Sequence, residues 1–270
     1  MKLIQSMLVI ALALVAAGRA ATGSPPPVDT AWLADSSWSD GAAVVSLYHG
    51  RIKRYGAWRE AEVRDYVIRE YLDPEELTKR DAVGPGLIPV LKANRMTSFL
   101  TGTYPYRRMA SLFFDRRDGS LVKGVGSSQD GCGIAFYRWD RNRRALSYDT
   151  YWEGEGAGSR PMPKRGDEFF EEEIPFLAAS LKAGATITVY SSLTRNKLGR
   201  DGPVRLTVAR RGGRTTLAAA DGTVWGSFVV DGKGSLESWT ITGKQEFSRT
   251  VKKRLYYWEL TKPGDEKLLR

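Results

Sequence analysis

From Trp38 onward, apolar and polar residues alternate along the chain with a period of two. Three segments show the alternation most clearly: residues 146–152, 204–208 and 238–242. In the last of these, Trp239 and Ile241 share one face and hydroxyl side chains occupy the other. A period of two is typical of β-strands with one buried and one exposed face. The pattern therefore predicts a chain built mainly of strands.

Short polar turns separate the predicted strands. The clearest are Arg117-Asp-Gly119, Arg141-Asn142, Arg211-Gly-Gly213, Asp221-Gly222 and Asp231-Gly232. Strands joined by such turns pair as antiparallel neighbours in sequence order. We therefore expect a mostly all-β fold, in which a curved antiparallel sheet forms an open barrel or half-barrel.

One segment departs from the period of two. Phe170, Ile174, Leu177 and Leu181 recur at helical spacing, and three glutamates precede or enter the first turn. Together with a glycine just past the end, this predicts one main helix at about 173–183, laid against the sheet. The Gly- and Pro-rich stretch 153–167 is a candidate domain boundary, but we expect one sheet to continue across it. A weaker pattern at 73–79 predicts a single helical turn.

The N-terminus has the pattern of a secretory signal over residues 1–20. Lys2 precedes an apolar run of 11 residues, Met7–Ala17, and small residues precede a cut after Ala20. The run is too short to cross a bilayer as a helix, although an uncleaved anchor is the alternative. Because no cysteine lies near the cut, we expect no lipid anchor. We expect export to the periplasm or beyond the cell, with no membrane span after cleavage.

This interpretation divides the chain into four parts. A linker at 21–37 follows the signal, since Ser24-Pro-Pro-Pro27 cannot hold a helix. A single β-rich domain is expected at 38–262 and a C-terminal tail at 263–270.

The composition excludes several classes of site. The 270-residue chain has one cysteine and one histidine, so it cannot form an intrachain disulfide or a Cys/His zinc site. We expect no cofactor and no metal. The 41 Lys and Arg exceed the 31 Asp and Glu, giving a net charge of +10, or +8 once Lys2 and Arg19 leave with the signal. Nucleic acid is not an expected partner for an exported chain without a Gly-rich phosphate loop.

The basic residues fall in short runs, several of them at predicted turns. If these turns gather at one end of the sheet, they form a basic rim that attracts anionic lipid or glycan. The runs are Arg51–Arg54, Arg141–Arg144, Arg195–Arg200, Arg210–Arg214 and Lys252–Arg254.

Aromatic and cationic residues concentrate around Tyr104-Pro105-Tyr106 and Arg107-Arg108. Such a cluster binds a polyanion or a lipid headgroup through cation–π and charge-assisted contacts. The alternative is a corner between strands in which the tyrosines pack. The predicted ligand-binding residues are Tyr104, Tyr106, Arg107, Arg108, Gln129 and Trp152.

Two constellations suggest catalysis instead. Cys132, in a Gly-flanked turn, is a candidate nucleophile with His49 as its base. The favoured alternative for Cys132 is a small buried thiol, and for His49 a histidine in a turn. Glu153 and Glu155 are a candidate carboxylate pair for glycoside hydrolysis, or simply part of a solvated loop.

Scattered motifs carry a resemblance to a known family. They are Arg54–Gly56, Pro89–Asn94, Thr101–Tyr106, Met109–Ser111, Ser127–Gln129, Cys132-Gly133, Tyr151–Gly156 and Glu173–Leu177. In these the chain resembles a family of uncharacterised exported bacterial proteins, many of them lipoproteins and some labelled "septum formation inhibitor Maf". The Ser-Pro-Arg-Arg motif of true Maf proteins is absent, and Asp130-Gly131 stands where the family has Glu-Trp. The resemblance implies a curved antiparallel sheet and no particular mechanism.

These observations lead to one main expectation and two alternatives. We expect a non-catalytic protein of the cell envelope that holds an amphiphilic or anionic component, lipid or glycan, in the concavity of the sheet. The first alternative is a hydrolase that uses Cys132 with His49 or the pair Glu153 and Glu155. The second is a structural or interaction module without a ligand. The oligomeric state does not follow from the sequence.

Overall fold

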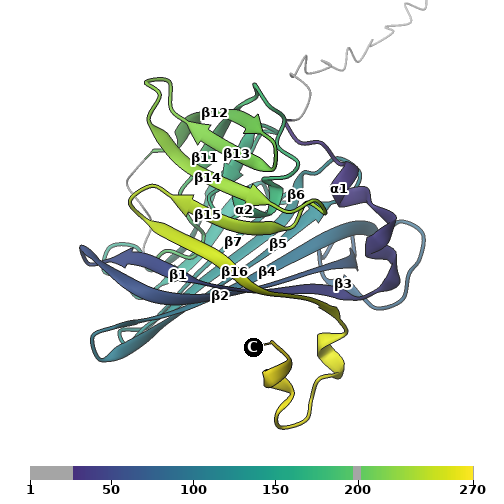
Figure 1. The fold of residues 1–270 in the computed structure, drawn as a ribbon, viewed down its shortest axis with the longest axis horizontal. Coiled ribbons are helices and arrows are strands. Elements are labelled where there is room, and N and C mark those ends of the chain that lie inside the picture. The colour runs from purple at the N-terminus through teal and green to yellow at the C-terminus, as the bar shows by residue number, and fades with distance from the viewer. Residues whose placement is uncertain (1–26, 197–201, 270) are drawn as a thin grey trace, which may run out of the picture.

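One continuous sheet curls into an open barrel in the computed structural model, which describes residues 27–196 and 202–269 (Figure 1). Neighbouring strands are antiparallel throughout, except for β10 and β11. The prediction of a mostly all-β fold with a curved antiparallel sheet is confirmed. The expected signal at 1–20 lies outside the described residues.

The strands follow one another along the chain with short connections. They are β1 (Ala43–Arg54), β2 (Ala57–Leu72), β3 (Lys79–Arg80), β4 (Ile88–Thr101), β5 (Tyr104–Asp115), β6 (Leu121–Gln129), β7 (Ile134–Asp140), β8 (Ala145–Thr150), β9 (Ala157–Pro161), β10 (Glu168–Phe170), β11 (Thr186–Tyr190), β12 (Val204–Arg211), β13 (Arg214–Ala218), β14 (Val224–Val230), β15 (Leu236–Ile241) and β16 (Gln245–Leu255).

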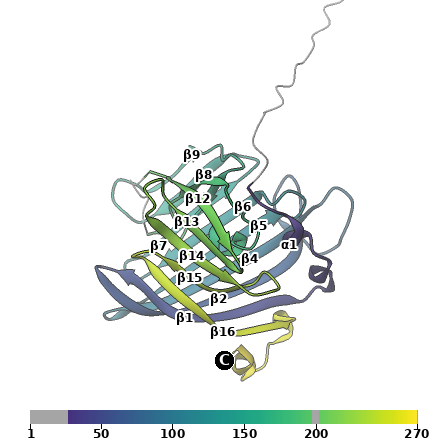
Figure 2. The same cartoon turned by 45° about the horizontal axis from the view of Figure 1, so that its top comes forward.

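The spatial order of the strands explains why the barrel is open. The order runs β10-β11-β12-β13-β14-β15-β16-β1-β2-β4-β5-β6-β7-β8-β9, with β3 paired to the side of β2. Strands β9 and β10 form the two edges and do not pair with each other. The Gly- and Pro-rich stretch 153–167, part of which forms β9, connects these two edges, and the strands before and after it belong to one sheet through the pairing of β16 with β1. As Figure 2 shows, the later strands curl over the face of the earlier ones.

The period of two sets which side chains face the interior. On β4, Leu91, Ala93 and Phe99 share a parity and are buried, whereas Met96 and Leu100 have the other parity and are exposed. All five predicted polar turns connect neighbouring strands. The main core therefore lies inside the barrel.

The predicted helix is present but shorter than expected. Helix α2 spans Glu173–Leu177 and lies inside the curve of the sheet, where Ile174 and Leu177 are fully buried (Figure 1). Beyond it the chain turns, because Leu181 forms an isolated antiparallel bridge with Val28. The bridge needs extended backbone, so the helix cannot continue to residue 183. The weaker segment at 73–79 forms a single turn, which is closed by a hydrogen bond from the Leu77 N–H to the Asp73 carbonyl oxygen at 3.0 Å.

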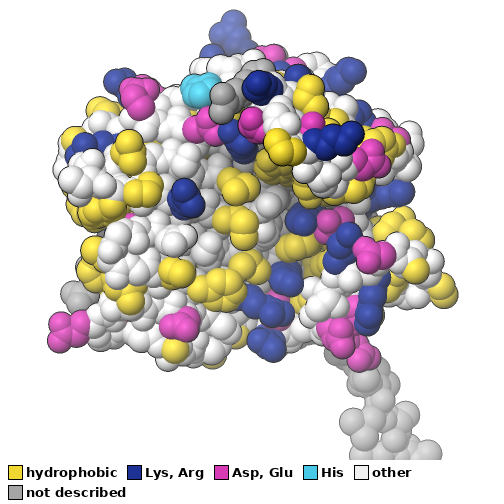
Figure 3. Space-filling view, turned by 90° about the horizontal axis from the view of Figure 1, so that it is seen from below, with side chains coloured by type: hydrophobic (Ala, Val, Ile, Leu, Met, Phe, Trp, Pro, Cys, Tyr) yellow, Lys and Arg dark blue, Asp and Glu magenta, His cyan; other side chains and the backbone are white. Residues whose placement is uncertain are grey.

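The segments before β1 and after β16 pack against the sheet. Within the expected linker at 21–37, α1 (Ala31–Ala34) begins, and a 3₁₀ helix follows at Ser36–Asp40; the side chains of Leu33 and Trp38 are buried. After β16 come 3₁₀ helices at Tyr257–Glu259 and Asp265–Leu269. Leu269 contacts an apolar cluster on β1 and β2. The underside of the molecule shows Lys and Arg side chains among hydrophobic ones (Figure 3).

A loop crosses the interior of the barrel over two glycines of β6, Gly124 and Gly126. We call residues 191–196 the inner strap. Leu193 of the inner strap is fully buried, and a Cβ on Gly126 would lie 2.1 Å from the Leu193 carbonyl oxygen. A Cβ on Gly124 would meet the Leu193 side chain at 3.1 Å. The glycines of β6 therefore allow the strap backbone to lie directly on the sheet.

We expect Gly126→Ala to destabilise the protein because its methyl group would overlap backbone rather than a flexible side chain. Overpacking of this kind costs about 3 kcal/mol, which corresponds to a fall in Tm of roughly 6–12 °C. Thermal unfolding followed by circular dichroism measures the change. Ser127→Ala, at the neighbouring position on the other face of β6, is the control and should unfold at nearly the wild-type temperature. Equal Tm values for the two variants would contradict the packing described.

Candidate functional site

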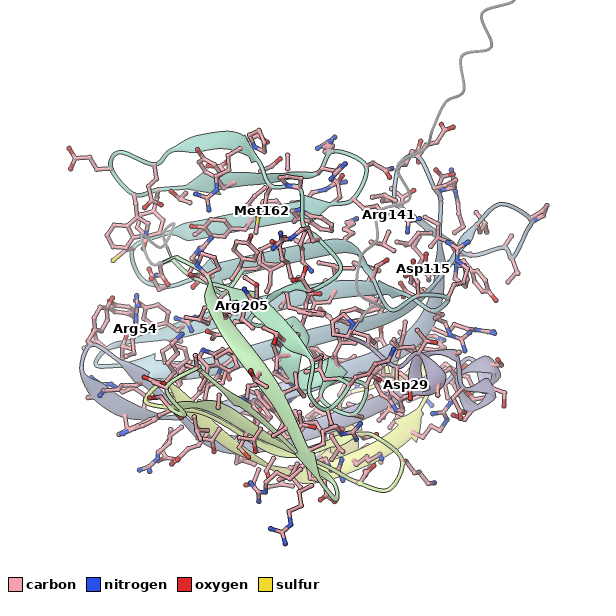
Figure 4. All side chains as sticks on the ribbon, turned by 90° about the horizontal axis from the view of Figure 1, so that it is seen from above. Asp29, Arg54, Asp115, Arg141, Met162 and Arg205 are labelled. Atoms are coloured by element: carbon pink, nitrogen blue, oxygen red, sulfur yellow. The ribbon has the colours of Figure 1, made fainter. Side chains whose placement is uncertain are left out.

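A cavity of about 200 Å³, lined mostly by polar and charged residues, lies inside one end of the barrel. We call this end the mouth; it carries the turns β1–β2, β4–β5, β6–β7, β8–β9 and β15–β16. Arg54 lies at this end, and Asp29, Asp115 and Arg141 lie at the other (Figure 4). The cavity is lined by Ile52, Lys53, Arg54, Arg95, Thr97, Arg108, Ala110, Glu171, Glu172, Pro175, Ser192, Thr194, Arg195, Asn196, Lys244 and Gln245.

The lining carries more positive than negative charge. It includes six Lys or Arg side chains and only two carboxylates, those of Glu171 and Glu172. Lys244 forms an ion pair with Glu171 at 2.8 Å. The other cationic residues of the lining lie on strands β1, β4 and β5 and on the inner strap, and all of them border this cavity.

Arg95 is neutralised by a buried partner. Its guanidinium donates to both carboxylate oxygens of Asp65, at 2.8 and 2.6 Å, and both side chains are buried. The rings of Phe176 and Trp239 lie 4.5 and 4.4 Å from the guanidinium carbon. This bidentate, ring-flanked pair satisfies Arg95 within the protein.

Arg108 has no such partner. Within the described parts of the chain, no carboxylate oxygen lies within 4 Å of its guanidinium, and its buried Nε has no hydrogen-bond acceptor. Its contacts are with rings: those of Phe99 and Tyr106, 5.2 and 5.9 Å away. Burial, together with repulsion from Arg54, lowers the pKa of Arg108 to about 10. The carboxylates of Glu172 and Glu171 attract this charge across the cavity, but neither forms an ion pair with it.

A group of tyrosines holds Arg54 beside this charge. Arg54 Nη2 donates to Tyr106 Oη at 3.1 Å, and the Tyr55 and Tyr106 hydroxyl oxygens are 2.6 Å apart. Tyr55 and Gly56 both have positive φ, 52° and 77°, as a two-residue hairpin turn of the primed type requires. The tight turn fixes Arg54 at the entrance of the cavity.

Glu172 fastens the inner strap across the cavity. Its carboxylate accepts from the backbone N–H groups of Leu193 at 2.9 Å and Thr194 at 3.1 Å, and from the Ser192 hydroxyl. Farther along, Asn196 donates to Asp130 on the β6–β7 turn and accepts from Ser128 at 3.1 Å. The strap is thus tied to α2 at one end and to the sheet at the other.

The structure brings together only some of the predicted ligand-binding residues. Tyr104, Tyr106 and Arg108 point to the interior side of β5, and Arg108 lines the cavity. Arg107 points to the outer face, where it pairs in register with Gln129. Trp152 lies on the β8–β9 turn against Tyr151, with 4.9 Å between ring centroids.

The thiol is not buried, and its proposed base lies elsewhere. Cys132 is exposed on the β6–β7 turn, so the expectation of a buried thiol is wrong. The reason is local: its backbone N–H donates to Asp130 Oδ1 at 2.7 Å, which turns the chain outward. His49 is on β1, four strand positions from β6, or about 19 Å along the sheet. It borders a separate, shallow depression with Arg51 and Glu60.

The two candidate carboxylates lie on the β8–β9 turn. Glu153 is exposed and Glu155 is half-buried, and neither lines the cavity. Among the residues that the structure describes, no group of three or more His, Cys, Asp or Glu is placed to hold a metal ion. The same residues contain no helix of the length and apolarity that a membrane span requires.

The basic runs do not form one rim. Arg51–Arg54 belongs to the mouth, whereas Arg141–Arg144 and Arg210–Arg214 belong to turns at the opposite end. Arg254 and Lys252 pair with Asp40 and Asp231. Residues 197–200 of the remaining run lie outside the described residues. Of these runs, Arg51–Arg54 and Arg195 contribute side chains to the cavity lining.

The cavity also contains residues that the sequence did not single out as a site. Arg95 occupies an inward position of β4 among buried apolar residues, and this departure from the alternating pattern was a signal that could have identified it. Glu171, Glu172 and Lys244 gave no such signal, because the strap and the β15–β16 turn reach the cavity only through the curl of the sheet.

Comparisons with known proteins give little guidance to function. No protein-family model matches the chain, and no curated protein matches it. A solved structure that it resembles is the crystal structure of a β-barrel-like protein of domain of unknown function DUF1849 from Brucella abortus. The identity is 8% and the TM-score 0.45, over 80% of this chain and 98% of that chain.

We expect Cys132 to react with a thiol reagent in the folded protein, because its side chain is exposed. Labelling with a chromogenic disulfide reagent, without denaturant, should reach one equivalent per chain. His49→Ala should leave the rate unchanged, since the two residues lie on different parts of the sheet. Labelling that requires denaturant, or that slows in the His49 variant, would contradict this arrangement.

Proposed function

We propose that the protein binds an anionic group of a cell-envelope component in the cavity, without catalysing a reaction. The observation that carries this proposal is Arg108, a half-buried guanidinium that lines the cavity, forms no ion pair with a carboxylate of the described residues, and has no acceptor for its buried Nε. The N-terminal pattern supports export to the envelope.

The energetics favour an anion at this position. A buried charge without a partner is costly, and a ligand that supplies the opposite charge removes that cost on binding. Charge-assisted hydrogen bonds from guanidinium groups to phosphate or carboxylate are among the strongest in proteins. Arg54 and Arg195 line the same cavity, so an anion beside Arg108 has more than one donor within the site.

The size of the cavity favours a headgroup rather than a whole lipid. Pockets that enclose drug-sized ligands are about 300–1,000 Å³, and this cavity measures about 200 Å³. The remaining interior is filled by the core around α2, including Ile174, Phe176 and Leu193. We infer that the concavity takes up the anionic part of a ligand while the rest stays outside.

We expect Arg108→Gln to weaken the binding of inorganic phosphate and glycerol 3-phosphate at least tenfold. The reason is that a charge-assisted bond contributes roughly 1.5–3 kcal/mol. Isothermal titration calorimetry near neutral pH measures the affinity. Arg107→Gln is the matched control, because it removes the same charge from the neighbouring position on the outer face. Wild-type protein that binds neither anion, or equal affinities in the two variants, would refute the proposal.

We also expect Arg108→Met to raise the unfolding free energy by about 1 kcal/mol, because it replaces a half-buried charge that forms no ion pair with an apolar side chain. Chemical denaturation without added anion provides the measurement. Arg95→Met should do the opposite, since it leaves Asp65 buried without its partner. If Arg108→Met destabilises the protein as Arg95→Met does, then Arg108 is a structural residue.

A further inference from the structure

Two neighbouring hairpins at the mouth carry an unusual set of side chains. Residues 51–58 and 98–108 contain five Lys or Arg and no Asp or Glu. They also contain five aromatic residues: Tyr55, Trp58, Phe99, Tyr104 and Tyr106. We call these two segments the docking edge. They adjoin in space, since β2 pairs with β4 and the hydroxyls of Tyr55 and Tyr106 meet at 2.6 Å.

Large apolar side chains of the docking edge project into solvent. Tyr55 and Leu100 are each 62% exposed, and Trp58 is 38% exposed. The Arg51 guanidinium lies over the Trp58 ring, 4.8 Å from its centroid. Met96 and Met109, paired in register on β4 and β5, extend the apolar surface along the outer face. This surface is not covered by any other described segment.

The docking edge is continuous with the cavity. Arg54 and Arg108 belong to the two hairpins and also line the cavity wall. A surface that contacts Tyr55 and Leu100 would therefore face the entrance to the site. Figure 4 shows Arg54 at the tip of this end.

We propose that the docking edge binds the surface of an anionic lipid bilayer and brings the phosphate of a lipid headgroup to Arg108. Trp and Tyr with nearby Lys and Arg are the residues that favour the boundary between lipid headgroups and acyl chains. Cations close to an anionic bilayer add electrostatic attraction. The proposal rests on the anion site described above and names its ligand as membrane-borne.

Charge argues against a second copy of the chain as the occupant. A symmetric contact between two docking edges would place like charges together, with no carboxylate in either segment to balance them. An anionic bilayer provides the complementary charge and a surface that accepts the projecting rings.

The test is flotation of the purified protein, freed of residues 1–20, with lipid vesicles. We expect binding to vesicles of phosphatidylglycerol and phosphatidylcholine in equal parts, weakening as salt is raised. We expect no binding to vesicles of phosphatidylcholine alone. Trp58→Asp combined with Leu100→Asp should reduce vesicle binding at least tenfold while leaving phosphate binding unchanged, because neither side chain lines the cavity. Val83→Asp, at an exposed apolar position on the loop before β4 at the far end, is the control and should bind vesicles normally.

The outcomes separate this inference from the anion site. Wild-type protein that binds phosphate but not anionic vesicles would overturn the docking proposal and leave the site intact. The same conclusion follows if the double variant binds vesicles like wild type. If light scattering shows a dimer that the double variant dissociates, and vesicles do not bind, the occupant is a second copy and the proposal fails. If the wild-type protein does not bind phosphate, the anion site itself is refuted.

Discussion

The arrangement of the interior depends on three glutamates in the short segment before and at the start of α2, each of which has a partner for its carboxylate. Glu171, Glu172 and Glu173 are consecutive, and each fixes a different part of the chain. Glu171 meets Lys244 on the β15–β16 turn, and Glu172 holds the inner strap. Glu173 pairs with Lys164 at 2.7 Å and accepts from the Phe170 N–H, with both charged side chains buried. Because unpaired buried charges are costly, this set of pairs fixes α2, the inner strap and the segment between β9 and β10 relative to one another.

Arg95 and Arg108, on adjacent strands, show how the same residue type serves two purposes. Arg95 is buried, pairs with the carboxylate of Asp65 and lies between two aromatic rings. Arg108 contacts rings, forms no ion pair, and has no acceptor for its buried Nε. Natural folds tend to retain such local inconsistencies at functional positions, where stability is given up for binding. The contrast between the two arginines is the main reason to place a ligand at one and not at the other.

The sequence predicted what depends on neighbours along the chain and missed what depends on the curl of the sheet. Alternation is a local property, so the strands and polar turns followed from it. The length of α2 did not, because the bridge between Leu181 and Val28 that ends it joins distant segments. Cys132 was expected to be a buried thiol because the sequence does not show whether its turn faces the interior or the solvent. The cavity was hidden for a similar reason: its walls come from β1, β4, β5, the strap and the β15–β16 turn.

The pairing of β1 with β16 has a consequence for how the chain folds. Ala43 lies opposite Leu255, so one strand of this pair is made first and the other nearly last. Until β16 arrives, the hydrogen-bonding groups along one side of β1 have no partner, and a free strand edge invites pairing with other chains. Closing so long a loop is also slow. The two halves of the sheet can therefore join only after almost the whole chain has been synthesised.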